Sequence, residues 1–208
     1  MQVHPPVLIL ASASPRRQQL LADAGIDLRV VPCPLPEPTE RPAHVSPARW
    51  AESLAYFKAS AVARSHAGLW VLGADTVVVC GDELLGKPRD LADARRMLER
   101  QAGRRSDVIT GLALLRATPG GYDRHLAHDV TGVWMRDDPA EREAYLASGD
   151  WAGKAGAYGI QDVGDRLVER IVGSFTNVVG LPVERVRRLL AQVGFRLAAV
   201  PTAEAAPG

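Results

Sequence analysis

The sequence has little of several features that mark specialised classes of protein. Its 208 residues include only two cysteines, Cys33 and Cys80, with no CxxC pair and no accompanying histidine cluster, a usage that favours neither a disulfide framework nor a zinc site. No apolar run approaches the ~20 residues of a membrane span, and the first run, Val7 to Ala11, is too short for a signal peptide. We therefore expect a cytoplasmic protein with reduced thiols and no membrane partner.

An excess of charge of one sign is also missing. The 25 Lys and Arg residues against 24 Asp and Glu residues leave a net charge of +1, and aromatic residues make up only 5%. Without a basic field or a basic stripe with interleaved aromatics, we expect no nucleic-acid partner, and any phosphate binding must be local. The ordinary 47% of hydrophobic residues supports a real core. We expect one domain over residues 1–200 and a frayed tail over 201–208.

Apolar runs and helical patterns alternate along the chain, which predicts an α/β fold. The expected strands are 7–10, 70–72 and 76–80 on either side of Gly73-Ala74-Asp75, 84–85, 108–115, 125–135, 167–172 and one from Phe195. The expected helices begin after the N-caps Ser14, Ser46, Asp90 and Asp138, and a last one runs from Pro182 to about Val193.

The turn after the first strand reads LILASASPRR and resembles an anion site. The small residues there, Ser12 and Ser14 among them, allow a ligand to approach the free N–H groups at a helix N-terminus. Arg16 and Arg17 lie in the first helical turn, where the helix dipole disfavours a cation unless an anion is present. A phosphate site is one interpretation, and a capped surface helix with solvated arginines is the other.

Three isolated charges indicate a cleft. Asp75 interrupts an apolar run, where an ionised carboxylate needs a partner, a ligand or access to water. Lys58 borders the apolar face of its helix, so its amine either reaches a cleft or extends along that face to solvent. Lys87 follows Gly86 between a hairpin strand and a helix, and either a functional or a structural role suits it.

A glycine-rich loop at 149–164 holds Lys154, Tyr158 and Gln161. Its glycine spacing does not match GxGxxG, and no Walker motif occurs anywhere in the chain. The loop either closes over a ligand, where Gln161 could read a base edge, or is a long surface loop.

Together, the cationic groups could hold a polyphosphate, while Asp75 with Glu37 or Glu40 could hold a hard divalent metal. No nucleophile elbow appears. Water is therefore the expected attacking group.

Three ordered motifs resemble the signatures of the Maf family: LASASPRRQQLL, GADTVVV with LGKP, and GKAGAYGIQ with GSFTNVVGLP. The resemblance spans Leu8 to Leu190. It implies a fold like that of the inosine triphosphatases, an elongated mixed sheet with flanking helices and two lobes around a central cleft, as a cytoplasmic homodimer. It also implies a pyrophosphatase that converts a nucleoside triphosphate to the monophosphate plus pyrophosphate with Mg²⁺ or Mn²⁺.

The same resemblance implies roles for particular residues. Asp75 is the expected catalytic base and, with Glu37, a metal ligand. The residues expected to bind substrate are Ser12, Ser14, Arg16, Arg17, Lys58, Thr76, Lys87, Lys154 and Gln161. The chain departs from the family pattern at 32–38, where only Glu37 remains of an acidic patch, and at Ser53, which stands in place of an arginine.

Residues beside the expected base indicate the substrate. Asp75-Thr76 resembles the branch that hydrolyses dTTP and UTP, whereas the branch acting on 7-methyl-GTP has Ser-Asp-Gln there. The Gln161 carboxamide can both donate to and accept from a pyrimidine edge. We therefore expect dTTP and UTP as substrates. The alternatives are a 7-methyl-GTP pyrophosphatase and a nucleotide-binding regulator of cell division with little catalysis.

Overall fold

The computed structural model describes residues 7–161 and 166–195 of the chain. Their centre is one mixed seven-stranded sheet in the order β2-β1-β3-β5-β6-β7, with the short β4 paired to β3. The strands are β1 (Leu8–Leu10), β2 (Leu28–Val30), β3 (Trp70–Cys80), β4 (Glu83–Leu85), β5 (Arg105–Thr118), β6 (Gly121–Met135) and β7 (Val168–Val172). The helices are α1 (Pro15–Asp23), α2 (Pro47–Ala63), α3 (Leu91–Gln101), α4 (Pro139–Ser148), α5 (Phe175–Val179) and α6 (Val183–Gln192), with a 3₁₀ turn at Ala155–Ala157.

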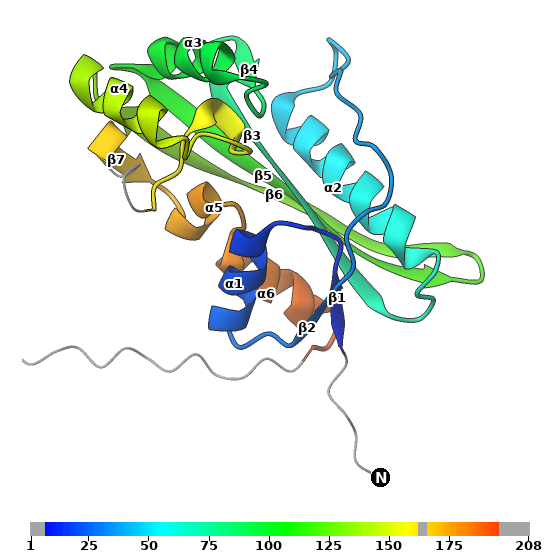
Figure 1. The fold of residues 1–208 in the computed structure, drawn as a ribbon. Coiled ribbons are helices and arrows are strands. Elements are labelled where there is room, and N and C mark those ends of the chain that lie inside the picture. The colour runs from blue at the N-terminus through cyan, green and yellow to red at the C-terminus, as the bar shows by residue number, and fades with distance from the viewer. Residues whose placement is uncertain (1–6, 162–165, 196–208) are drawn as a thin grey trace, which may run out of the picture.

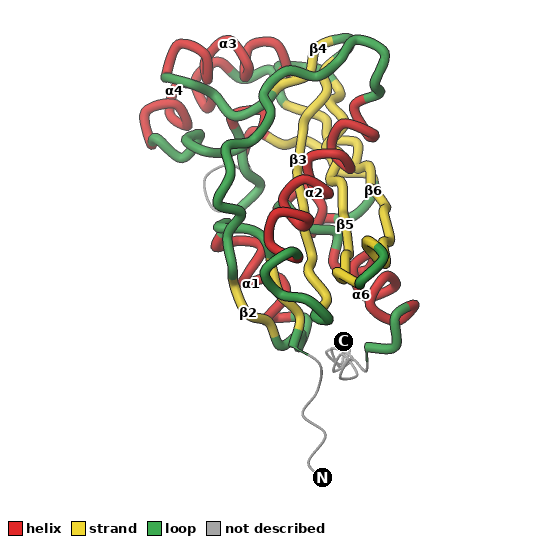
Figure 2. The backbone as a smooth tube through the Cα atoms, turned by 90° about the vertical axis from the view of Figure 1, so that its right-hand side faces the viewer, coloured by secondary structure: helices red, strands yellow, loops and turns green. Residues whose placement is uncertain are grey.

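The long hairpin of β5 and β6 gives the molecule its elongated shape (Figure 1, Figure 2). β1 pairs in parallel with β2 and β3, whereas β3, β5, β6 and β7 pair antiparallel. α3 and α4 lie at one end of the hairpin, and α1, α6, β1 and β2 lie at the other (Figure 1). The expected α/β class and elongated mixed sheet with flanking helices are confirmed.

Successive residues of β3 face opposite sides of the sheet, as the pleat of a strand requires. Val71 packs in a cluster with the alanines of α2, whereas Leu72 and Ala74 pack with α1 and α6. This alternation directs Asp75 toward α2 and Thr76 toward the opposite side. The two residues that the sequence singled out as neighbours therefore serve two different layers.

α2 lies unusually close to the sheet because two glycines remove side-chain bulk beneath it. A Cβ at Gly73 would lie 2.1 Å from the carbonyl oxygen of Ala55, and a Cβ at Gly111 would lie 2.1 Å from the carbonyl carbon of Ala51. Both alanines are fully buried on the inner face of the helix. This close approach holds Lys58, one turn after Ala55, over β3.

The helix starts agree with the sequence prediction. Ser14, Ser46, Asp90 and Asp138 each accept a backbone N–H at the start of their helix, as N-caps do. Across the described ranges, no helix is both long and apolar enough to cross a membrane.

Some expected elements were wrong or incomplete. β3 is continuous through Gly73-Ala74-Asp75, because Asp75 keeps its ladder position opposite Gly111 and its side chain finds a partner outside the strand. β2 and the five-residue α5 were not expected from the sequence, and β5 and β6 are longer than expected. The strand expected after Phe195, the frayed tail at 201–208 and residues 162–164 of the glycine-rich loop lie outside the described residues.

Candidate active site

A cavity of about 600 Å³ lies where β3 meets α1, α2, α5 and the glycine-rich loop. Its size is in the range of small-molecule and cofactor sites. All eleven residues expected at the site line it: Ser12, Ser14, Arg16, Arg17, Glu37, Lys58, Asp75, Thr76, Lys87, Lys154 and Gln161. Glu40, the alternative carboxylate, does not appear in the cavity lining. The structure thus brings together residues from 12 to 161 around one cavity.

Lys58 joins the two expected carboxylates. Its Nζ lies 2.6 Å from Asp75 Oδ1 and 3.0 Å from Glu37 Oε2. The side chains of Lys58 and Asp75 are only 7% and 12% exposed, whereas that of Glu37 is 43% exposed. The alternative in which Lys58 extends to solvent is therefore wrong. The close packing of α2 against the sheet directs the amine toward β3, where the two carboxylates pair with its charge.

The same two carboxylates are suited to a divalent cation. Both converge on one cationic centre, the ammonium of Lys58. Mg²⁺ is commonly held by one or two carboxylates together with substrate phosphates. No group of three or more His, Cys, Asp or Glu side chains with metal-site geometry occurs in the part of the chain that the structure describes. The residues therefore fit a cation that completes its shell with ligand oxygens.

Arg17 is turned into the protein, although the sequence placed it beside Arg16 as an equivalent. Its Nε donates to the carbonyl of Gly180 at 2.9 Å, and its two terminal nitrogens donate to Ser12 Oγ at 3.2 Å and Thr76 Oγ1 at 3.1 Å. Burial lowers the pKa of this guanidinium, against the raising influence of Asp75 and Glu37. One side chain thus ties together the turn after β1, strand β3 and the end of α5.

The first turn of α1 forms the wall beside Arg17. Ser14 caps the helix by accepting the backbone N–H of Arg17, and its own N–H donates to Ser12 Oγ at 3.3 Å. Arg16 is half-buried at this helix N-terminus, and exposed Lys87 enters the lining from the segment after β4. The helix dipole and these cations together favour an anion.

The glycine-rich loop is held in place by a tyrosine that the sequence analysis did not single out. The buried hydroxyl of Tyr145 accepts the N–H of Gly159 at 3.1 Å and lies 3.5 Å from Lys154 Nζ. Burial raises the pKa of Tyr145 to about 12, so it stays a neutral hydroxyl at physiological pH. Because Tyr145 looks like an ordinary apolar-face residue of α4, its sequence context gives no signal of this function.

Helix α3 holds the same loop from the other side. The fully buried Gln101 side chain donates to the carbonyls of Met97 and Gly156 at 3.0 and 2.8 Å. The backbone N–H of Gly156 donates in turn to the carbonyl of Gly86. Gly156 has a φ of +70° and lies against Val78, so a side chain there would be both strained and crowded. The described part of the loop is therefore held in place as a wall of the cavity and is not a free surface loop.

The charge of the cavity differs sharply from that of the whole chain. Among the described residues, five cationic side chains and two carboxylates line it, a formal net charge of +3 against +1 for the entire sequence. The polar lining is accompanied by apolar side chains that sequence reasoning did not identify, such as Val108, Ile160 and Val179. This arrangement can bind a polyanion with an attached apolar or aromatic group.

Comparison with known proteins gives close relatives over nearly the whole chain. A protein of Symbiobacterium thermophilum named dTTP/UTP pyrophosphatase is 46% identical over 192 residues, which cover 90% of this chain and 94% of that protein. Proteins with the same name from Moorella thermoacetica and Geobacter sulfurreducens are 46% and 45% identical, each over 90% of this chain and 95% and 96% of their own length.

The fold itself is shared more widely. The structure of a HAM1 protein from Coxiella burnetii superposes with a TM-score of 0.50 at 14% identity, covering 90% of this chain and 99% of that one. This likeness supports the expected inosine-triphosphatase-like fold. Residues 7–193 match the family described as Maf-like protein. With this match and relatives above 40% identity over nine-tenths of its length, the chain belongs to the Maf family.

Proposed function

We propose that this protein is a pyrophosphatase that hydrolyses dTTP and UTP to the monophosphate and pyrophosphate. The observation that carries the proposal is the cavity, in which the buried carboxylate of Asp75 lies among five cationic side chains of the described lining. Relatives named dTTP/UTP pyrophosphatase, at about 45% identity over 90% of the chain, support the substrate.

In this proposal the phosphates lie against the N-terminus of α1. Arg16, Lys87 and Lys154 hold the charge that develops on the phosphate oxygens. Three N–H donors of Arg17 bind neighbouring protein atoms, so this side chain fixes the shape of the wall.

Asp75 acts on the attacking water. One of its carboxylate oxygens accepts from Lys58 at 2.6 Å. As a general base it takes a proton from water as the water attacks the α-phosphorus, and the bond to the pyrophosphate leaving group breaks. General-base contributions are typically 10² to 10⁴ in rate.

Asp75 and Glu37 are also the residues that would hold Mg²⁺ or Mn²⁺. Such a cation supplies charge neutralisation to phosphate oxygens when it is bound. The unusual proline-rich segment around Glu37 does not remove this carboxylate from the cavity, since Glu37 reaches Lys58 at 3.0 Å.

The test is product analysis with the purified protein. We expect dTTP and UTP to yield the monophosphate and pyrophosphate, and EDTA to abolish the reaction. A nucleotide-binding regulator would bind the same nucleotides and release no pyrophosphate, which would refute the proposal. A homodimer and a cytoplasmic location stay predictions, the first testable by light scattering.

A further inference from the structure

We propose that the ammonium of Lys58 keeps Asp75 and Glu37 from binding a divalent cation until a nucleotide enters the cavity. The proposal rests on the proposed function, because the same cavity must accept a triphosphate. It concerns the order in which metal and nucleotide bind, which the fold and the family relationship leave open.

The first argument for the proposal is the position of Lys58. Its Nζ lies within 3.0 Å of an oxygen of each carboxylate, and its side chain is 7% exposed. A cation held by both carboxylates needs the place that this ammonium already fills. Since Asp75 is itself buried, leaving its charge unpaired during an exchange is costly.

The second argument is the charge of the residues around Lys58. Arg16, Arg17, Lys87 and Lys154 line the same cavity, and Asp75 and Glu37 are the two carboxylates among its described lining residues. Among the described lining residues, a displaced ammonium would therefore lie in a predominantly cationic cavity. Adding a divalent cation to a cavity whose described lining has a formal charge of +3 adds electrostatic repulsion, and partial burial weakens the screening by water.

A nucleotide reverses both effects. Its phosphate oxygens offer Lys58 new acceptors, and its negative charge compensates the cations that line the cavity. Lys58 can then move from the carboxylates to a phosphate, which frees Asp75 and Glu37 for the metal. Metal and nucleotide are thus expected to bind together, and the free protein should have little affinity for the metal alone.

The experiment measures Mn²⁺ binding to the nucleotide-free protein by the loss of the electron paramagnetic resonance signal of aqueous Mn²⁺. We expect weak binding by the wild type. Lys58→Gln removes the ammonium but keeps an uncharged side chain, and it should tighten Mn²⁺ binding by at least ~10-fold, equivalent to about 1.4 kcal/mol. Lys58→Arg retains a cation between the carboxylates and should bind Mn²⁺ as weakly as the wild type.

Lys87→Gln is the matched control. It removes one positive charge from the same cavity, but Lys87 is exposed and is not one of the groups paired with Asp75 or Glu37. We expect it to tighten Mn²⁺ binding by less than about threefold. Equal tightening by Lys87→Gln and Lys58→Gln would overturn the proposal, because the cause would then be total charge and not the place that Lys58 occupies.

A measurement on the wild type keeps the proposal testable if Lys58→Gln does not fold. The complex of the protein with a non-hydrolysable dUTP analogue should bind Mn²⁺ at least ~10-fold more tightly than the free analogue binds it. Wild-type protein that binds Mn²⁺ equally tightly without the analogue would refute the proposal. None of these measurements uses turnover, so a failure of pyrophosphate release would refute the proposed function separately.

Discussion

At the scale of single residues, Asp75 is the side chain whose loss is easiest to interpret. Asp75→Asn keeps the volume of the side chain and removes the charge that we propose as the base. We expect the rate of pyrophosphate release from dTTP to fall by at least ~10², with the fold retained. Lys58 keeps one carboxylate partner, Glu37, in this variant.

Asp129→Asn is the control for Asp75→Asn. Asp129 is also a strand aspartate, but it lies on β6, opposite Thr110 and away from the cavity lining. Its variant should turn over like the wild type. Turnover near the wild-type rate in Asp75→Asn would rule out the proposed base.

Arg16 and Arg17 are adjacent in sequence and should differ in what they stabilise. Arg17 donates to three acceptors on separate segments, and a lysine amine cannot reproduce that planar fork. Arg17→Lys should lower the free energy of unfolding by about 1–3 kcal/mol, the cost of leaving buried polar groups unpaired. Half-buried Arg16 should tolerate lysine within about 0.5 kcal/mol. Urea denaturation of both variants checks this, and equal stability of the two would contradict it.

At the scale of elements, the close packing of α2 against β5 depends on Gly111. A Cβ at this position would lie 2.1 Å from backbone of Ala51, so the helix must shift. Gly111→Ala should cost about 1–3 kcal/mol in stability. Because α2 carries Lys58, we also expect at least ~10-fold lower kcat/KM.

Gly120→Ala is the matched control for Gly111→Ala. Gly120 lies in the turn of the same β5–β6 hairpin, and a Cβ there would meet no atom within 4 Å. Thermal melting and turnover of the two variants are compared. If both variants behave alike, the close approach of α2 is not what positions Lys58.

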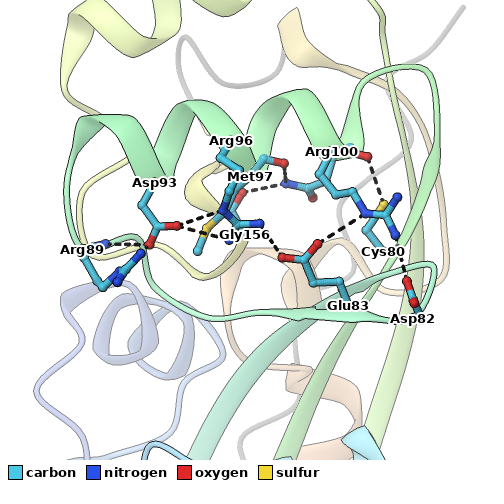
Figure 3. Close-up of polar contacts among 10 residues, drawn as sticks. Cys80, Asp82, Glu83, Arg89, Asp93, Arg96, Met97, Arg100 and Gly156 are labelled. Carbon is cyan, nitrogen blue, oxygen red and sulfur yellow. Dashed lines mark hydrogen bonds and ion pairs between the residues drawn. The ribbon is translucent and has the colours of Figure 1, made fainter.

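The network around α3 makes a prediction about pH. Asp93 accepts from Arg89 and Arg96, and Arg96 and Arg100 also reach Glu83 (Figure 3). Hydrogen bonding by Arg89, followed by that of Arg96, lowers the pKa of Asp93 below its usual 3.8. A carboxylate with a lowered pKa contributes stability that is present above its unfolded value and is lost as pH falls through the folded value.

Melting temperatures measured from pH 7 down to about pH 3 test this contribution. The wild type should lose stability more steeply than Asp93→Asn below about pH 4, because the variant has no such carboxylate to protonate. At neutral pH the variant should melt lower than the wild type. Parallel curves for the two proteins would show that Asp93 contributes nothing to acid sensitivity.

At the scale of the whole molecule, the base preference depends on walls that come from distant parts of the chain. Gln161 and Tyr158 line the cavity from one loop, and Val108 and Val179 line it from β5 and α5. A site that pairs polar groups with a pyrimidine edge discriminates strongly, whereas tolerating the thymine methyl costs little. We therefore expect kcat/KM for dTTP and UTP to exceed that for ATP, GTP or 7-methyl-GTP by at least ~10-fold, about 1.4 kcal/mol.

Gln161→Ala tests the source of that preference. It should reduce the ratio between UTP and GTP more than it slows UTP itself. Kinetics on the five nucleotides decide the matter, and a purine triphosphate as the best wild-type substrate would refute the base assignment while leaving the pyrophosphatase chemistry in place.

The sequence alone determined the parts of this protein that depend on local patterns. N-caps at Ser14, Ser46, Asp90 and Asp138 follow from residue types next to periodic apolar runs, and the structure confirms them. The ordered motifs were enough to predict the family, the fold class and eleven of the residues that line the cavity.

Only the tertiary structure decided how those residues are used. Arg16 and Arg17 are indistinguishable in sequence, yet packing of α1 against α5 buries one and leaves the other beside the cavity. The helical phase of Lys58 allowed its amine to lie either in solvent or in a cleft. The close packing of α2 over Gly73 and Gly111 places the amine in the cleft. The physical reason is common to both cases: local patterns fix the face on which a side chain lies, but its partner is fixed by contacts between segments distant in sequence.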